Sequence, residues 1–389
     1  MRRCEIGIIG LGLMGSAALH ELVSRGSDVL GFDPLMIGEA RGSSHGSCRV
    51  FRRFNFESEA YTALSDRAFE GWLRLEAESG RTLLMPCPVL EAGPPDCELV
   101  TNSRNAALAA KTLITGPRNG AEANVAFPAF NLPNDWDVVV QDSGGILLVE
   151  EAMRAFRDGA KGRIVRAVAR MRAMSEGICI STAAEEVMAE QVVIAAGPWV
   201  ADLIPGLKRH LTLTRQTVGW FQPARPDTTR YGEFPIFILE TARGMVYGFP
   251  DFEGRGVKAA QHDHGEIVLA DQWDPPASDA ELETVSATLA TLIPGAAGPI
   301  IDRDICLYTN TARADVFVDG GNEFIIDRLP QDPRIIVASP CSGHGAKFAT
   351  AIGAMLADMA CDPGVRPPQA FRIDRFSSFA SRRHAQTKA

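Results

Sequence analysis

Short apolar runs, glycine turns and amphipathic segments follow one another from the first residues of this chain. The run at 4–9 leads through a glycine turn at 10–15 into a helical pattern over 16–24, and a second apolar run follows at 29–32. Strand, helix and strand in this order predict a βαβ unit. We therefore expect the chain to open with an α/β unit.

The rest of the pattern predicts a mixed α/β protein of two interleaved lobes. The predicted elements are helices over 61–78 and 346–359, a strand end feeding a helix over 145–156, and strands over 163–174, 177–182, 187–194, 211–221, 236–239, 244–249, 256–260 and 334–338. Residues 87–146 are rich in Pro, Gly and Asn and contain one periodic segment, 106–113. A lobe boundary is placed near 85, and the polar tail 377–389 is expected to be frayed.

Length and composition agree with a folded enzyme-sized protein. The chain has 389 residues, which is more than one compact core usually holds. Hydrophobic residues make up 46% and charged residues 22%, values that exclude a disordered, collagenous or coiled-coil chain. We expect two lobes with separate cores.

Charge and cysteine usage narrow the class further. The net charge of −9 disfavours a nucleic-acid partner. The eight cysteines are scattered without a C-x-x-C pair, so neither a metal site nor a disulfide framework is predicted, and a reducing, cytoplasmic location is expected. The uncharged stretch 6–19 is too short to span a bilayer, and no membrane partner is predicted.

The first motif is the glycine turn at 10–15, with Asp33 at the end of the next strand. Gly10, Gly12 and Gly15 let the backbone approach a pyrophosphate at a helix N-terminus, and a carboxylate about 20 residues on binds a ribose hydroxyl. A merely tight strand-to-helix turn is the simpler alternative. The same string also resembles nicotinamide-dependent hydroxyacid dehydrogenases, so the turn alone does not identify the dinucleotide.

Residues 42–53 carry one His and three Arg behind a loop. Arg49 and Arg52 are three apart, so they would share one face if a helix begins here, and guanidinium groups there could bind an anion. The alternative is a solvated basic helix start.

Two further segments carry lysines in unusual surroundings. Lys258 follows Gly256 on a predicted strand, where a buried ammonium is costly unless it has a partner or a task, although it could also point to solvent from a strand edge. Lys347 lies where a glycine loop enters a helix, so that its charge adds to the partial positive charge of the helix N-terminus. Cys306, by spacing alone, is interpreted as inert core.

Several of these segments, in the same order, resemble the monomeric sarcosine oxidase and N-methyltryptophan oxidase family, within the amino-acid oxidases that have a glutathione-reductase-like FAD domain. The resembling segments are 10–15, Asp33, 42–53, 193–197, 247–258, 306–309 and 342–348. Ser44, Ser47 and Cys48 depart from the family pattern, as do Pro340 and Cys341, and 87–146 matches poorly.

The resemblance implies roles for individual residues. Cys306 matches a cysteine that forms a thioether to the flavin, which replaces its reading as inert core. Lys258 matches the lysine at which oxygen is activated in the family. A cation in a site without water would stabilise the superoxide that forms there. The catalytic group is expected to be Lys258, His45, Arg49, Tyr247 and His262, and the substrate-binding group Arg52, Lys347 and Tyr308. The cofactor-binding group is expected to be Gly10, Gly12, Gly15, Asp33, Ser43, Ser44, Arg49, Cys306, Gly343, Gly345 and Lys347.

The resemblance also implies a fold and an activity. We expect a glutathione-reductase-like Rossmann FAD domain from 1–85, 145–212 and 307–389, and a mainly antiparallel-sheet substrate domain from 86–144 and 213–306. The expected enzyme is a monomeric FAD-dependent oxidase of a carboxylate-bearing secondary amine. A hydride equivalent would pass to the flavin, the imine would be hydrolysed, and O2 would be reduced to H2O2.

The sequence leaves two other functions open. One is an NAD-dependent hydroxyacid dehydrogenase, and the other is a non-catalytic FAD-binding partner or subunit of an electron-transferring complex. The substrate side chain, and the choice among secondary, cyclic and primary amines, are not specified by these residues.

Overall fold

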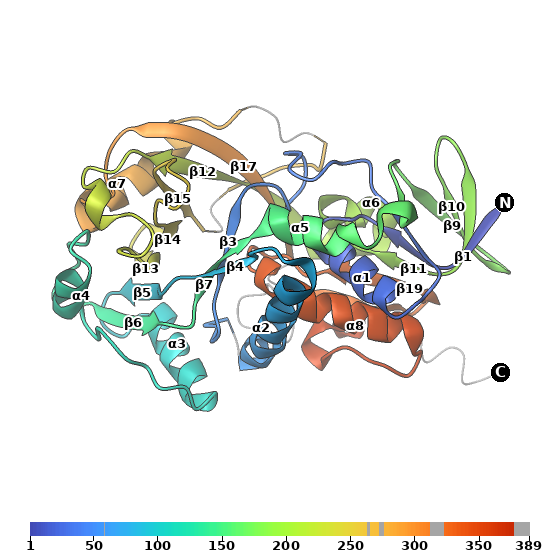
Figure 1. Cartoon of the computed structure of the whole chain (residues 1–389), viewed down its shortest axis with the longest axis horizontal. Helices are drawn as coiled ribbons and strands as arrows, with labels where there is room; N and C mark the ends of the chain where they lie inside the picture. The colour runs from blue at the N-terminus through green and yellow to red at the C-terminus, as the bar shows by residue number, and fades with distance from the viewer. Residues whose placement is uncertain (58, 263–264, 272–275, 312–322, 377–389) are drawn as a thin grey trace.

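The computed structural model describes residues 1–57, 59–262, 265–271, 276–311 and 323–376, which form two lobes built on separate sheets (Figure 1). The strands of the first sheet are β1 (Arg2–Ile9), β2 (Val29–Phe32), β8 (Ile164–Val165), β9 (Arg170–Met174), β10 (Gly177–Ser181), β11 (Glu186–Ile194), β18 (Ile325–Leu329) and β19 (Asp332–Ser339). Strands β19, β11, β1, β2 and β8 run parallel, whereas β18 and the β9–β10 hairpin pair antiparallel.

Helices cover this parallel sheet and bury its central strands. They are α1 (Leu13–Ser24), α2 (Glu59–Ser79), α5 (Val149–Asp158) and α8 (Ala349–Cys361), and α1 packs against α5 and α8. Every residue of β2 is buried, as expected for a parallel strand covered on both faces. A Cβ at Gly353 would come within 2.6 Å of the Ala17 Cβ, so the glycine permits the close contact of α8 with α1.

The second lobe is built on a mainly antiparallel sheet. Its strands are β5 (Val89–Gly93), β6 (Asp137–Gln141), β12 (Leu211–Phe221), β13 (Ile236–Thr241), β14 (Gly244–Phe249), β15 (Val257–Gln261), β16 (Glu266–Ile267) and β17 (Ile300–Thr311). The one parallel pair between these strands is β5 with β13, and β17 pairs with β12 along its length. Helices α3 (Glu98–Ala109), α4 (Gly120–Ala126) and α7 (Glu283–Leu292) belong to this lobe (Figure 1).

A third, small sheet lies between the two large ones in Figure 1. It consists of β3 (Cys48–Phe51), β7 (Gly145–Leu148) and β4 (Leu84–Pro86), all antiparallel. The short helix α6 (Val200–Leu203) leads from the first sheet toward β12. The segment from β3 to α2 therefore passes between the lobes, where residues of both can reach it.

The predicted fold class is confirmed, and several predicted elements need correction. The segment 163–174 forms two strands, β8 and β9, instead of one. The periodic segment 106–113 overlaps the end of α3, which ends at Ala109, and 87–146 also contains β5, β6 and α4. Strand β18 and most of β17 were not predicted. The tail 377–389 lies outside the described residues.

The predicted domain boundaries fall inside two strands. Residues 212 and 213 lie within β12, and residues 306 and 307 lie within β17, both in the second sheet. All other strands of the two large sheets lie in the segments predicted for their lobe, and the division into two domains stays a prediction. Within the described part of the chain, no helix is both long enough and apolar enough to cross a membrane.

Candidate active site

The glycine turn at the start of α1 has the shape of a dinucleotide cradle. Gly10 has φ +90°, and a Cβ there would lie 2.5 Å from the Ala195 carbonyl oxygen. A Cβ at Gly15 would lie 1.9 Å from the Gly10 carbonyl oxygen. Side chains at either position would force the backbone apart, so the turn requires glycine for its own geometry and leaves backbone N–H groups at the start of α1.

Polar side chains surround this turn. Asp33, at the end of β2, accepts hydrogen bonds from the Leu11 N–H at 2.6 Å and the Leu35 N–H at 2.7 Å. Ser44 Oγ accepts from the Leu13 N–H at 3.0 Å, and Ser43 Oγ is buried without a hydrogen-bond partner among the described residues. A carboxylate oxygen can accept more than one hydrogen bond, so Asp33 retains capacity for a ribose hydroxyl. These groups fit the adenosine and pyrophosphate of a dinucleotide.

A cavity lies where β3, β12, β14, β15 and β17 meet the loop before α8. Predicted site residues lining it are His45, Arg49, Arg52, Tyr247, Lys258, His262, Cys306, Tyr308, Gly343 and Lys347. Its apolar wall includes Phe56, Val218, Ile238, Met245 and Phe249. The cavity therefore combines an apolar wall with several cationic groups, as small-molecule sites do.

One face of β17 carries polar side chains into the cavity. Asp304, Cys306 and Tyr308 alternate along the strand, and alternate residues of a strand share a face. The Arg49 Nη2 donates to the Cys306 Sγ at 3.7 Å. Cys306 is partly exposed, and the same guanidinium also donates to the carbonyl oxygens of Ser43, His45 and Cys48. A thiol open to the cavity thus lies beside a fixed cation.

His45 is held by groups that accept hydrogen bonds. Its Nε2 lies 2.6 Å from the Ile305 carbonyl oxygen, and its Nδ1 lies 3.1 Å from the Gly42 carbonyl oxygen. The Asp304 carboxylate lies 3.6 Å from Nε2. Burial raises the pKa of Asp304, but the hydrogen bond and charge of His45 outweigh it, so that pKa lies below its ordinary value. Both ring nitrogens therefore face oxygen atoms that can accept a hydrogen bond.

Lys258 is buried, so the alternative of a solvent-facing lysine at a strand edge is wrong. Strand β15 pairs with β12 on one side and with β14 on the other, and Lys258 is 6% exposed. Its Nζ lies 3.7 Å from the Cys48 Sγ and within 6 Å of the ring centroids of Trp220 and Phe249, a range in which an aromatic face attracts a cation. The strand and its apolar neighbours therefore hold the ammonium at the cavity wall.

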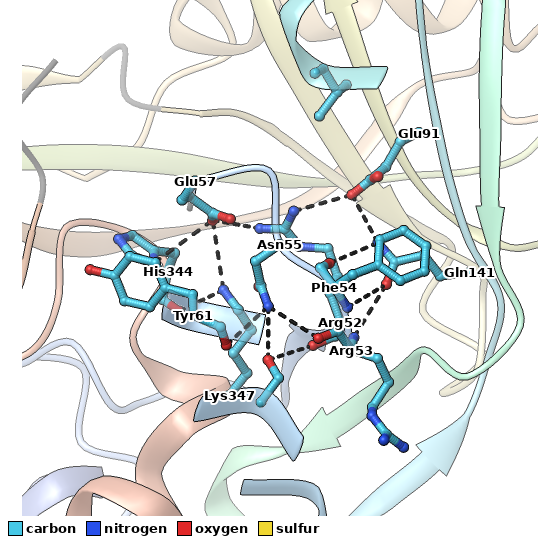
Figure 2. A network of polar contacts seen from close by, with 12 residues as sticks. Arg52, Arg53, Phe54, Asn55, Glu57, Tyr61, Glu91, Gln141, His344 and Lys347 are labelled. Carbon is cyan, nitrogen blue, oxygen red and sulfur yellow. Dashed lines mark hydrogen bonds and ion pairs between the residues drawn. The ribbon is translucent and has the colours of Figure 1, made fainter. Parts of the chain in front are cut away.

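Arg52 and Lys347 converge on one carboxylate, that of Glu57 (Figure 2). The Arg52 Nη2 lies 2.5 Å from the Glu57 Oε1, and the Lys347 Nζ lies 3.7 Å from the same oxygen. The Arg52 Nη1 donates to the Glu91 Oε1 at 3.1 Å. Arg52 follows strand β3, so the conditional prediction of a helix shared by Arg49 and Arg52 is wrong.

Burial and charge act in opposite directions on the pKa values of this group. Burial lowers the pKa of Lys347 to about 7, although Glu57 partly offsets this effect. Burial raises the pKa of Glu57, but Arg52, Lys347 and His344 together outweigh it and hold that pKa well below its ordinary value. The site therefore contains an anion under all ordinary conditions, and a lysine whose charge is sensitive to pH near neutrality.

Aromatic side chains line the cavity beside the glycine loop before α8. The His262 ring lies 5.7 Å from the Tyr308 ring and 6.4 Å from the Tyr247 ring, measured between centroids. Gly343 has φ +74°, and a Cβ there would lie 2.4 Å from Tyr308. Burial raises the pKa values of both Tyr247 and Tyr308. The tyrosines are therefore neutral hydrogen-bonding groups near neutral pH.

The predicted site residues thus fall into two groups. The cavity unites the proposed catalytic and substrate-binding residues, whereas Gly10, Gly12, Gly15, Asp33 and Ser44 lie at the α1 turn. Ser43 precedes Ser44, and its carbonyl oxygen accepts from Arg49 at the cavity. Gly345 is in neither group: it lies in the loop before α8, where its N–H donates to the Cys341 carbonyl oxygen.

The sequence reasoning assigned no role to Glu57, Glu91, Asp304 or Arg157. Arg157, from α5, donates to the Leu11 carbonyl oxygen in the glycine turn. Asp304 could have been found, because it lies two residues before Cys306 on an alternating strand. Glu57 lies five residues after Arg52 in the same loop, and this spacing is a weaker indication that the two residues interact. Glu91 had no signal in the sequence.

Sequence comparisons relate the whole chain to flavin enzymes. The family described as FAD dependent oxidoreductase (DAO) matches residues 5–359. The chain is 32% identical to the monomeric sarcosine oxidase of Streptomyces avermitilis over 366 residues, 92% of this chain and 93% of that protein. It is also 32% identical to the N-methyl-L-tryptophan oxidase of Yersinia pestis over 388 residues, 96% of this chain and 99% of that protein.

Solved structures have the same fold at lower sequence identity. The open form of NikD, described as an unusual amino acid oxidase, matches with a TM-score of 0.81 and 18% identity over 96% of this chain and 98% of that one. The L-proline dehydrogenase from P. horikoshii matches with a TM-score of 0.76 and 21% identity over 95% and 96% of the two chains. With its glycine turn, its cavity and these relatives, the chain belongs to the FAD dependent oxidoreductase family, among the flavin-dependent amine and amino-acid oxidases.

Proposed function

We propose that this enzyme oxidises the C–N bond of a secondary amine that carries a carboxylate, as in an N-methyl amino acid. The amine loses two electrons and two protons, and water hydrolyses the resulting imine to an amine and an aldehyde or oxo acid. Dioxygen takes up two electrons and two protons and leaves as H2O2. The observation that carries this proposal is one cavity with Arg52 and Lys347 at one part of its wall and Cys306 and Lys258 at others.

The proposed cofactor is FAD held at the α1 turn and at the cavity. Gly10, Gly12, Gly15, Asp33, Ser43 and Ser44 would hold its adenosine and pyrophosphate part. Arg49, Cys306, Gly343, Gly345 and Lys347 would hold its ring part, and the open thiol of Cys306 beside Arg49 supports a covalent link there. When bound, the flavin supplies the two-electron acceptor that connects amine oxidation to oxygen reduction.

The carboxylate clamp, defined here as Arg52 and Lys347, would bind the acid group of the substrate. Both cations lie in the cavity wall and already bind a carboxylate of the protein, that of Glu57. A guanidinium and an ammonium directed at one carboxylate give orientation as well as affinity. The clamp would thereby fix which C–H bond is presented for oxidation.

Other cavity residues would orient the amine and assist oxygen. Tyr247 and Tyr308 are neutral rings with hydrogen-bonding groups, and the ring of His262 lies close to both, which gives a wall suited to an uncharged amine. The Lys258 ammonium, buried among aromatic rings, would stabilise negative charge that develops on oxygen as it is reduced. Arg49 adds fixed positive charge next to Cys306, and the imidazole of His45 is hydrogen-bonded to the carbonyl of the preceding residue, Ile305.

The remaining expectations concern the oligomeric state of the enzyme, its location in the cell and the alternative of a nicotinamide cofactor. Relatives described as monomeric sarcosine oxidases support a monomer that acts on a small molecule and O2. All eight cysteines are free, which supports a reducing, cytoplasmic location. The family match to FAD oxidoreductases removes the basis for the nicotinamide-dependent alternative.

The direct test supplies the purified holoenzyme with a panel of N-methyl amino acids and follows oxygen consumption and peroxide release. We expect equal amounts of oxygen consumed and peroxide formed with at least one member of the panel. Flavin reduction without peroxide release would favour the second alternative, a subunit that transfers electrons to a partner protein. No reduction by any member would contradict the proposed reaction.

A further inference from the structure

Arg52 is fixed from the second lobe by a residue that does not line the cavity. Glu91 lies on β5, between β13 and β6 in the second sheet, and its side chain is fully buried. Its backbone is held by pairing with Ile238 on one side and with Val139 on the other. The Glu91 carboxylate therefore cannot move away from Arg52 without disturbing an interior strand.

The same carboxylate is joined to the loop that carries Arg52. The Gln141 Nε2 donates to the Glu91 Oε1 at 3.3 Å and to the Phe54 carbonyl oxygen at 3.1 Å. The Gln141 Oε1 accepts from the backbone N–H groups of Arg53 and Phe54. Figure 2 shows Glu91 and Gln141 on one side of Arg52, and Glu57, His344 and Lys347 on the other. The two edges of the guanidinium thus have different partners.

Two cationic side chains and two carboxylates meet around Arg52 before any ligand binds. The cations Arg52 and Lys347 face the carboxylates of Glu57 and Glu91, and His344 Nδ1 lies 3.8 Å from the Glu57 Oε1. A ligand carboxylate at the clamp adds one negative charge to this buried group. Uncompensated charge in a buried site is costly, so the fixed anion opposes the ligand while it also holds the guanidinium in place.

We propose that Glu91 is the positioning residue of the carboxylate clamp: it holds Arg52 through Nη1, and its charge weakens the binding of a ligand carboxylate. This inference rests on the proposed function of the clamp. Burial raises the pKa of Glu91, and the positive charge of Arg52 offsets this rise only in part. This agrees with a carboxylate that is kept in its position at a cost in free energy. Two substitutions at this one residue should therefore have opposite effects.

Glu91→Gln keeps an oxygen that can accept from the Arg52 Nη1 but removes the charge. The Km for an N-methyl amino acid, and the Kd for a carboxylate ligand, should each fall by roughly three- to tenfold. Glu91→Leu has similar volume but no acceptor, so Arg52 loses its anchor and both constants should rise by about tenfold or more. In both variants kcat should stay within about threefold of the original, because the reacting atoms are untouched.

The binding measurement separates this inference from the proposed function. Titration calorimetry on the holoenzyme uses methoxyacetate, an unreactive carboxylate with an ether oxygen where sarcosine has nitrogen, and methoxyacetamide as its neutral counterpart. The gain in Glu91→Gln should be confined to the carboxylate. Glu240→Gln is the matched control, because Glu240 lies on the neighbouring strand β13 and outside the cavity lining.

The outcomes are distinct. Weaker binding in both Glu91 variants, with lowered thermal stability, would mean a merely structural role and overturn the inference. Unchanged binding in both would overturn it as well. Normal oxidation with no effect of Glu91 on binding leaves the proposed function intact. If no form of the protein binds the carboxylate, the clamp is wrong, and the inference fails with it.

Discussion

The Nζ of Lys258 lies 3.7 Å from the Sγ of Cys48, although 210 positions separate the two residues in the sequence. Lys258 forms no salt bridge with any carboxylate in the described part of the chain, and its other neighbours are the rings of Trp220 and Phe249. Its charge helps to lower the pKa of the Asp304 carboxylate, which lies beyond salt-bridge distance. A buried ammonium without a salt-bridge partner has affinity for an anion that forms beside it. This is the electrostatic condition that reduction of oxygen requires.

Lys258→Met should separate the two halves of the reaction. We expect the reaction of the reduced enzyme with oxygen to slow by roughly 10²–10³-fold, because the stabilising cation is gone. Anaerobic reduction by substrate should change by less than about threefold, as stopped-flow absorbance would measure. Lys161→Met removes an exposed charge and is the control. Equal slowing of both halves would argue against an oxygen-specific role.

Cys306→Ser should release the flavin from its covalent link. Acid-precipitated protein of the original sequence should stay yellow, and a tryptic peptide containing Cys306 should carry the mass of FAD. The serine variant should give a colourless pellet with the flavin in the supernatant. Cys341→Ser is the matched control, since Cys341 accepts from the Thr309 N–H close by on β17. A colourless pellet from the original protein would contradict the link.

The charge of Lys347 should make substrate binding depend on pH. Burial lowers the pKa of Lys347 to about 7, so the ammonium is present below that pH and is lost as the pH rises through it. The Km for a carboxylate-bearing substrate should therefore rise with pH above about 7, until it levels off without the ammonium. Lys347→Arg, which stays protonated, should flatten this rise. The same rise in both proteins would point to another group, such as the substrate amine.

Gly15→Ala should prevent the dinucleotide turn from closing. The added Cβ would meet the Gly10 carbonyl oxygen at 1.9 Å, and this contact is to the backbone, so no side-chain movement relieves it. We expect less FAD per chain and a lower midpoint of thermal unfolding. Gly162→Ala is the control, because a Cβ there meets nothing within 4 Å. An FAD content equal to that of the control would show that the turn tolerates the methyl group.

The local part of the fold was predictable, because its signals lie close together in sequence. The glycine turn and the strand 29–32 need only neighbouring residues to form a βαβ unit, and both were placed correctly. Strands 163–174 and 256–260 show the limit. Where a strand breaks, and whether it lies inside a sheet or at its edge, depend on partners far along the chain. The position of Lys258 inside the sheet could not be predicted from its neighbours.

The candidate site, too, could be predicted from the sequence only in part. Arg52 and Lys347 were identified through a family resemblance, and their meeting at Glu57 depends on the path of one loop. Glu91 could not be foreseen, because its contact with Arg52 joins a strand of the second sheet to the segment after β3. A lone acidic residue in an apolar strand has no pattern that predicts its partner.

The alternation along β17 makes the cavity sensitive to the length of that strand. Asp304, Cys306 and Tyr308 face one way because they are spaced by two, while Leu307 between them is almost fully buried. Insertion of a single residue just before Asp304 would slip the strand against β12 and exchange its two faces. The thiol and the phenol would then enter the packed interior and aliphatic side chains would enter the cavity. An insertion or deletion of one residue within this strand would therefore remove the polar side chains from the cavity. Insertions in the turn before Ile300 would leave the same side chains facing it.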